Sequence, residues 1–525
     1  MSQISVNNLT FYYEGSYDNI FEDVTFQIDT DWKLGFIARN GRGKTTFLKL
    51  LTGQYEYLGS ISASVVFDYF PFEVGDRSLV VVDAIEKIYP DYEFWKVCRE
   101  LGLLKMDPEI LYRPFSELSN GEQTRVMLAL LFSKDNHFLL IDEPTNHLDL
   151  ESREVLKDYL NSKKGFILVS HDRNFMDGCV DHVLAINKTN IEVQQGNFSS
   201  WWENKKRQDT YELSENERLK KDIKRLTESA RRTKQWADDV EAAKIGFRSL
   251  KYERSADLRA YIGEKSRRMQ MRRKNLERRQ QREIEEKSNL LKNLETVEDL
   301  KIMPLRHYKE KLAVMENCTI AYVGKPCGNG VAANGQREIV SGLDLEVRQG
   351  ERVFLKGSNG CGKSSILKTI LKEVYEKENK DSKLCLAESS LPVLVQGRIE
   401  TPNQLIVSYC SQDTSMLKGT LKEYAQEHGI DETLFFTLLR KLDFSRLQLE
   451  KRIEDYSGGQ KKKVLLAGSL CTKAHLYIWD EPLNFIDVFS RLQIEELILK
   501  FQPTMLLVEH DKKFMENVAT RIIDI

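Results

Sequence analysis

The sequence predicts an α/β protein in which two P-loop nucleotide-binding domains are joined by a long α-helical hairpin. Phosphate-binding loops occur twice, as ARNGRGKTT at 38–46 and GSNGCGKSS at 357–365. Between them, residues from about Trp202 to Met303 contain no proline and have a helical pattern. A chain of 525 residues is long enough for about three domains. We expect their boundaries at 1–202, 203–304 and 305–525.

The net charge of −2 conceals an uneven distribution. Residues 205–300 contain 27 Lys and Arg against 19 Asp and Glu, so their +8 leaves −10 for the remainder. Such an asymmetry indicates a basic element directed at a polyanion.

Composition also limits the location. The eight cysteines form no CxxC pair, which is typical of free thiols in a reducing compartment. The start MSQISVNNLT has no signal-peptide pattern, and the longest apolar run, at 126–132, is far below the roughly 20 residues of a membrane span. We expect a cytoplasmic protein without a membrane span.

The first P-loop has the context that nucleotide binding needs, because LGFIARNGRGKTTFLKLL predicts a strand, a glycine turn and a helix start. Gly41 and Gly43 let backbone N–H groups approach phosphate, Lys44 would neutralise its charge, and the Thr45 hydroxyl would hold Mg²⁺. The strict pattern has glycine where this chain has Ala38.

Two carboxylates follow the buried strand predicted in HFLLIDEPTNHLD. Asp142 suits Mg²⁺, and Glu143 suits a general base that positions the attacking water. The next strand, FILVSHD, ends at His171, which could sense the γ-phosphate, although a lone histidine is more often structural.

The order of P-loop, LSNGEQTR, DEPTNHLD and SHD resembles the ATP-binding cassette (ABC) fold, and the second half repeats it with YSGGQKKK, WDEPLNFID and VEHD. The resemblance implies an ATPase that uses ATP and Mg²⁺, with Glu143, Glu481, His171 and His510 as catalytic residues. In that family two cassettes close head to tail, so ATP on Lys44 would meet Ser457 and ATP on Lys363 would meet Ser119. The implied Mg²⁺ ligands are Thr45, Asp142, Ser364, Gln412 and Asp480. The expected ATP-binding residues are Tyr13, Asn40, Gly41, Gly43, Lys44, Thr45, Thr46, Ser119, Gly121, Tyr322, Gly357, Asn359, Gly360, Gly362, Lys363, Ser364, Ser365, Gln412, Ser457 and Gly459.

Two points remain open in this set. Tyr13 and Tyr322, at matching offsets before the P-loops, could stack on adenine or be ordinary strand-end aromatics. Phe72 stands where the second half has Gln412, and a phenyl ring cannot coordinate Mg²⁺. We expect both sites to bind ATP and at least one to hydrolyse it.

The middle segment has a coiled-coil spacing at Leu219, Ile223 and Leu226, and predicts two antiparallel helices of roughly 35 residues. Residues 244–282 contain 14 Lys and Arg against four Asp and Glu, with aromatic residues interleaved. A solvated hairpin is the plain alternative, but this combination favours RNA. Phe247, Tyr252 and Arg254 are the expected residues of its tip.

Tandem cassettes with such a linker resemble the ABC-F family. Within that family the chain resembles the antibiotic-resistance proteins of the Vga/Lsa type, in its long linker, in WDEPLNFID and in Glu509. The resemblance implies a monomer that binds the ribosomal E site through rRNA and P-site tRNA and displaces drugs from the peptidyl-transferase centre, with hydrolysis driving release. The alternatives are a housekeeping ABC-F translation factor, the ATPase subunit of a drug exporter, and a DNA-repair or chromosome ATPase.

Overall fold

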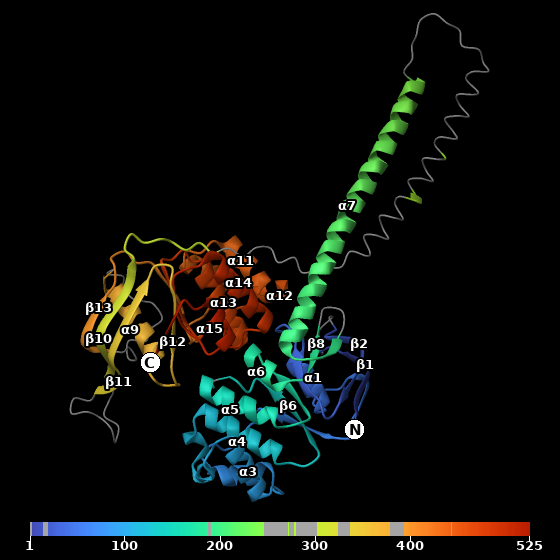
Figure 1. The fold of residues 1–525 in the computed structure, drawn as a ribbon. Helices are drawn as coiled ribbons and strands as arrows, with labels where there is room; N and C mark the ends of the chain where they lie inside the picture. Colours follow the sequence, from blue (N-terminus) through green and yellow to red (C-terminus); the bar gives the residue numbers. More distant parts are fainter. Residues whose placement is uncertain are drawn as a thin grey trace, which may run out of the picture. The chain divides into compact units, whose positions relative to one another are not determined.

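The structure is a computed structural model that describes residues 3–13, 19–146, 148–186, 191–245, 271, 278–279, 302–323, 336–377, 393–442 and 444–525. The chain divides into two compact units. The first comprises Met1–Trp201 with Asp299–Ile525, and the second comprises Trp202–Glu298. The first unit contains two cassettes of the same design, coloured blue to cyan and yellow to red in Figure 1.

The first cassette contains an antiparallel sheet and a mostly parallel one. The antiparallel sheet has the order β2-β1-β4, from β1 (Gln3–Phe11), β2 (Phe21–Asp29) and β4 (Leu58–Ser62). The second has the order β5-β6-β7-β3-β8-β9, in which only the β8–β9 pair is antiparallel. Its strands are β3 (Lys33–Ile37), β5 (Val66–Phe70), β6 (His137–Asp142), β7 (Phe166–Val169), β8 (His182–Ile186) and β9 (Ile191–Gln195).

The second cassette repeats this plan. Its antiparallel sheet has the order β11-β10-β13, from β10 (Lys311–Val323), β11 (Gln336–Arg348) and β13 (Val393–Glu400). Its parallel sheet has the order β14-β15-β16-β12-β17. This order matches β5-β6-β7-β3-β8 in the larger sheet of the first cassette. These strands are β12 (Arg352–Lys356), β14 (Val407–Cys410), β15 (Leu476–Asp480), β16 (Met505–Val508) and β17 (Arg521–Asp524).

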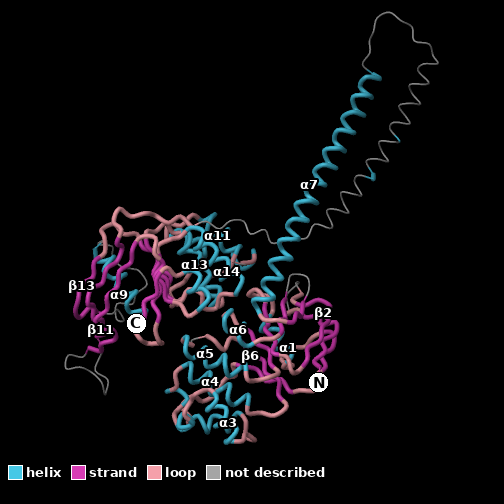
Figure 2. The backbone as a smooth tube through the Cα atoms, in the orientation of Figure 1, coloured by secondary structure: helices cyan, strands magenta, loops and turns pink. Residues whose placement is uncertain are grey.

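In each cassette the strands gather around the P-loop helix, and a separate group of helices lies beside them (Figure 2). The first cassette has α1 (Lys44–Leu51), α2 (Val81–Ile88), α3 (Phe94–Leu103), α4 (Asn120–Phe132), α5 (Leu150–Asn161) and α6 (Arg173–Cys179), with short 3₁₀ turns η1 (Pro108–Tyr112) and η2 (Phe115–Glu117). The second has α9 (Lys363–Lys377), α10 (Leu421–Glu427), α11 (Glu432–Lys441), α12 (Arg446–Leu449), α13 (Gly458–Cys471), α14 (Val488–Phe501), α15 (Lys512–Val518) and η4 (Ile453–Asp455).

Burial of apolar side chains fixes each P-loop helix to its sheet. Phe47 of α1 is fully buried, and its ring lies 5.4 Å from that of Phe36 in β3 and 6.0 Å from that of Phe21 in β2. The helix is thereby held between the two sheets, and the loop that precedes it lies at the carboxyl end of β3. This is the edge where α/β folds bind ligands.

The helix after the first cassette, α7, runs from Phe198 to Ile245 without a break. Its 48 residues exceed the roughly 35 expected, and its first turn, 198–201, belongs to the first unit, where Phe198 and Trp201 are buried. The hairpin tip residues Phe247, Tyr252 and Arg254 lie outside the described residues, as does the return helix apart from 271 and 278–279. No helix of the described residues is long and apolar enough to cross a membrane.

Candidate functional site: two nucleotide cavities shared between cassettes

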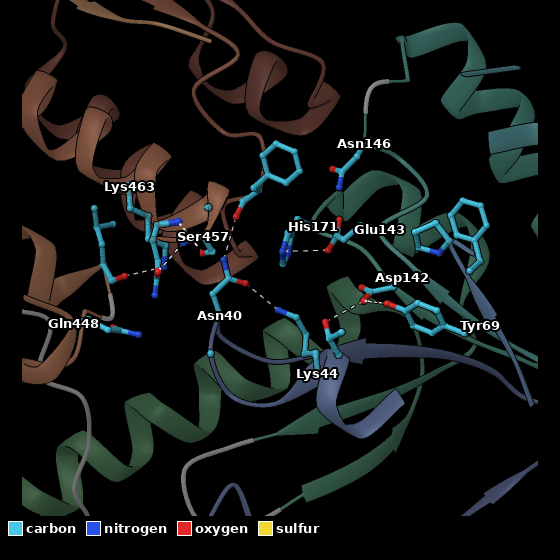
Figure 3. Close-up of a pocket in the computed structure, with 18 of the residues that line it drawn as sticks. Asn40, Lys44, Tyr69, Asp142, Glu143, Asn146, His171, Gln448, Ser457 and Lys463 are labelled. Carbon is cyan, nitrogen blue, oxygen red and sulfur yellow. Dashed lines mark hydrogen bonds and ion pairs between the residues drawn. The ribbon is translucent and has the colours of Figure 1, made fainter. Parts of the chain in front are cut away.

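Two cavities lie within the first unit, and each is lined by one P-loop and by the signature helix of the other cassette. The first site, of about 620 Å³, brings residues of the first P-loop and strand ends together with Ser457 and Gly459. Of the expected residues, it is lined by Asn40, Gly41, Lys44, Thr45, Asp142, Glu143, His171, Ser457 and Gly459. In Figure 3, Ser457 and Lys463 lie across the cavity from Asn40 and Lys44.

The second site, of about 760 Å³, joins the second P-loop to the signature of the first cassette. Its expected lining residues are Ser119, Gly121, Tyr322, Asn359, Gly360, Gly362, Lys363, Ser364, Ser365, Gln412, Glu481 and His510. Tyr13, Gly43, Thr46, Gly357 and Asp480 do not line either cavity. Each belongs to the loop, strand or helix that supports one of the two sites.

Each signature serine caps the N-terminus of a helix, and these N-termini lie at the cavities. Ser119 caps α4 by accepting from Glu122 N, and Ser457 caps α13 by accepting from Gln460 N, each within a capping box. Because a helix N-terminus presents free N–H groups and a partial positive charge, both caps suit an anionic ligand.

Both P-loops have the conformation that a phosphate cradle needs. Gly43 and Gly362 have φ of 87° and 104°, in the left-handed region, and a Cβ there would lie 2.6 Å from Ile20 Cγ2 and 2.5 Å from Val340 Cγ2. Lys44 Nζ donates to Ala38 O at 2.7 Å, and Lys363 Nζ donates to Ser358 O at 2.7 Å. Burial lowers the pKa of Lys44, against the pull of nearby carboxylates.

Two of the residues expected to hold Mg²⁺ are hydrogen-bonded to each other in each site. Thr45 Oγ1 donates to Asp142 Oδ2, and Ser364 Oγ donates to Asp480 Oδ1, each at 3.0 Å. No three His, Cys, Asp or Glu side chains of the described residues group as a metal cage. Few protein oxygens combined with nucleotide phosphates are what Mg²⁺ ordinarily takes, so the residues fit the ion.

The two glutamates after these aspartates have different surroundings. Glu481 accepts from Gln412 Nε2 at 2.8 Å and from Asn484 Nδ2 at 2.6 Å, with His510 Nε2 3.6 Å away. Although burial acts to raise the pKa of Glu481, the nearby His510 ring and the charges of Lys462 and Lys363 lower it overall. We attribute the fixed position of the Glu481 carboxylate to the Gln412 and Asn484 donors.

In the first site Glu143 is half-buried, and its buried carboxylate oxygens have no hydrogen bond among the described residues. His171 Nε2 lies 3.1 Å from Oε1 of this glutamate. Burial, and then the charge of Asp142, raise the pKa of Glu143 to about 8, while burial holds the pKa of His171 well below its usual value. Glu143 and Glu481 also share a positive φ, of 52° and 46°.

The two tyrosines before the P-loops take equivalent positions. Tyr13 OH lies 2.8 Å from Thr46 Oγ1, and Tyr322 OH lies 3.2 Å from Ser365 Oγ. The Tyr13 ring packs edge-on against Phe11 and Tyr55, and 42% of the residue is exposed. These contacts are compatible with either sequence interpretation, so adenine stacking stays a prediction.

Sequence analysis missed several residues that the structure places at the cavities. Tyr69 and Lys463 line the first site, and Arg153 and Asn484 line the second. Three positions are occupied by equivalent residues in the two cassettes. The pairs are Tyr69 with Tyr409, Asn146 with Asn484, and Arg125 with Lys463. Aligning the halves outward from the motifs would have found them.

Paired P-loop cavities completed by signature helices define an ATP-hydrolysing protein with two nucleotide-binding cassettes. The sequence profile of the "ABC transporter" family matches residues 21–146 and 340–484, which together exceed half of the chain. The chain belongs to the ABC transporter family, and its activity is ATP hydrolysis with Mg²⁺.

Several curated proteins are similar along nearly the whole chain. "Ribosome protection protein VmlR" of Bacillus subtilis is 25% identical, covering 97% of this chain and 84% of its own length. "Energy-dependent translational throttle protein EttA" of Haemophilus influenzae is 24% identical, covering 96% and 89%. "ABC transporter F family member 5" of Arabidopsis thaliana is 26% identical, covering 100% and 75%. These likenesses are to proteins of the ABC-F group.

A solved structure has the same fold. The archaeal ribosome recycling factor aABCE1, in complex with the ribosomal stalk protein aP1, aligns with a TM-score of 0.58 at 18% identity, covering 98% of this chain and 87% of that one. The order of strands in the two cassettes is therefore that of a tandem ABC protein.

Proposed function

We propose that this protein binds the ribosome and protects it from antibiotics of the peptidyl-transferase centre, using ATP to enter and hydrolysis to leave. The observation that carries the proposal is the likeness to a ribosome protection protein along 97% of this chain, which includes the linker and both cassettes. We place this action in the cytoplasm and assign it to a monomer, whose two sites are built from one chain.

The linker supplies the second argument. The continuous helix α7 of 48 residues is about 70 Å long at 1.5 Å per residue. It leads into residues 244–282, whose excess of ten positive charges suits rRNA and tRNA phosphates. We propose 203–304 as the linker between cassettes 1–202 and 305–525, with Phe247, Tyr252 and Arg254 acting at the drug site.

The site residues are assigned by their chemistry. We propose that Lys44 and Lys363 hold phosphate, and that Thr45 and Ser364, with their aspartates, hold Mg²⁺. Glu143 and Glu481 would orient the attacking water, while Ser119 and Ser457 would bind the phosphates from the opposite cassette. In the second site, Gln412 lies at 2.8 Å from Glu481, where it can position both that carboxylate and the metal.

The proposal is tested by translation in vitro with purified ribosomes and a lincosamide or pleuromutilin. We expect the purified protein to restore synthesis in the presence of ATP. A variant with alanine at Phe247, Tyr252 and Arg254 should bind ribosomes but restore less synthesis. Its matched control carries alanine at Arg207, Lys220 and Lys224, which lie in α7 outside the proposed tip. Failure to restore synthesis with any peptidyl-transferase drug, despite ATP-dependent ribosome binding, would contradict protection.

A housekeeping translation factor is the second candidate, favoured by the likeness to EttA over 96% of this chain. That function predicts an effect on synthesis without any drug, and a growth defect on deletion. The same translation assay without drug therefore separates the two candidates. Absence of ATP-dependent binding to ribosomes would reject both.

A further inference from the structure

The hydroxyl of Tyr69 contacts the carboxylate of Asp142 in the first site. Tyr69 lies in β5, next to β6, and its register partner there is Leu140. Its OH donates to Asp142 Oδ2 at 2.9 Å, the same oxygen that receives Thr45 Oγ1 at 3.0 Å (Figure 3). Two hydroxyl donors on one oxygen fix the plane of the carboxylate.

The second site has a different arrangement at the equivalent position. Tyr409 of β14 corresponds to Tyr69, but its buried hydroxyl has no hydrogen bond to Asp480 among the described residues. That site has Gln412 in its cavity, three residues after Tyr409. In the first cassette the residue at this offset is Phe72, which does not line the cavity, whereas Tyr69 does.

The difference lies in side chains at the metal-binding end of each cavity. Where the second site offers an amide oxygen, the first offers a phenol bound to its aspartate. Groups that hydrogen-bond to a metal ligand orient that ligand. Their removal commonly lowers metal affinity by roughly 10–100-fold.

We propose that Tyr69 is a positioning residue of the first site. It holds Asp142 in the orientation that binds magnesium–nucleotide, in a site where Phe72 replaces the glutamine that the second site has at Gln412. When Thr45 is engaged by the metal, Tyr69 is the side-chain donor that remains on Asp142. A phenol has an ordinary pKa of about 10, so it keeps its proton and stays a donor at neutral pH. The inference rests on the ATPase activity and needs no ribosome.

The test isolates each site. In a Lys363→Ala background, which disables the second site, Tyr69→Phe is compared with the parent for binding of a fluorescent ATP analogue across a Mg²⁺ titration. We expect Tyr69→Phe to need about tenfold more Mg²⁺ for half-maximal binding, with Mg²⁺-free nucleotide affinity unchanged. Mn²⁺ bound with the nucleotide should show the same loss by electron paramagnetic resonance.

The matched control is Tyr409→Phe in a Lys44→Ala background, where the Mg²⁺ midpoint should stay within about twofold. An unchanged midpoint in Tyr69→Phe overturns the inference. It is also overturned if Tyr69→Phe weakens Mg²⁺-free and Mg²⁺-bound nucleotide equally, because that result indicates a packing role. An equal shift in Tyr409→Phe would likewise reject a role specific to the first site.

Discussion

Arg173 and Glu495 form a buried ion pair between the two cassettes. Arg173 Nη2 of α6 lies 2.6 Å from Glu495 Oε2 of α14, and both side chains are less than a tenth exposed. Asn517 Nδ2 of α15 donates to the other carboxylate oxygen at 2.6 Å. The two residues of this pair are 322 positions apart in the sequence.

Removal of one partner should destabilise the protein, because it leaves the other charge buried and unpaired. We expect Arg173→Ala to lower the free energy of unfolding by about 3 kcal/mol, measured by denaturant titration. Arg173→Met with Glu495→Gln removes both charges and should lose less than Arg173→Ala. As a control, Arg207→Ala disrupts an exposed pair with Glu203 and should have no measurable effect. Equal stability of Arg173→Ala and the parent would contradict the prediction.

The general bases can be tested by removing both carboxylates. We expect Glu143→Gln with Glu481→Gln to bind ATP and lose turnover by at least about a hundredfold, trapping the closed form. Of the single variants, Glu481→Gln should lose more, because only Glu481 is held by Gln412 and Asn484. Phosphate release measures turnover, and unchanged turnover in the double variant would reject both assignments.

The left-handed conformation of Gly362 predicts intolerance of any side chain. A Cβ would lie 2.5 Å from Val340 Cγ2 and 2.7 Å from Ile339 Cγ2, so Gly362→Ala should abolish nucleotide binding in the second site while the first still binds. Equilibrium binding in a Lys44→Ala background measures the loss in the second site, and binding by Gly362→Ala alone measures the first site. Gly102→Ala is the matched control, since nothing lies within 4 Å of its Cβ in α3. It should stabilise the protein by about 0.5–1 kcal/mol and leave nucleotide binding intact.

Lys463 and Asp487 predict a dependence of stability on pH. Lys463 Nζ lies 2.9 Å from Asp487 Oδ2, and both side chains are almost fully buried. Burial acts to raise the pKa of Asp487, but the Lys463 charge and hydrogen bond hold it below its ordinary value of 3.8. A lowered folded-state pKa stabilises the folded state above the unfolded pKa, and this contribution is lost as pH falls.

The unfolding free energy of Asp487→Asn should therefore fall below that of the parent by a constant amount from about pH 5 to 7. The difference should narrow below about pH 4, because the carboxylate of the unfolded parent protonates there while that of the folded parent stays ionised. Denaturant titrations at several pH values measure it. A gap that widens on acidification would show that the pair does not stabilise the fold.

The main motifs of the cassettes could be predicted because they are local features of the chain. Glycines in a P-loop, a hydroxyl residue after the lysine and carboxylates at a strand end act over a few residues, so spacing alone predicted them. The tandem α/β fold and the ATPase activity were confirmed. The pairing of Lys44 with Ser457 came from family resemblance, and the first cavity brings these residues together.

Contacts between side chains that are distant in the sequence could not be predicted from local motifs. The Tyr69 hydroxyl on Asp142, the Arg173–Glu495 pair and the contact of Arg153 Nη1 with His510 O at 2.9 Å join residues 73 to 357 positions apart. In the sequence, Phe72 is visible only as a replacement of the glutamine, and nothing local indicates that the Tyr69 phenol contacts Asp142. Such contacts depend on how strands register and helices dock, and on the rotamers that burial then selects, none of which a local motif encodes.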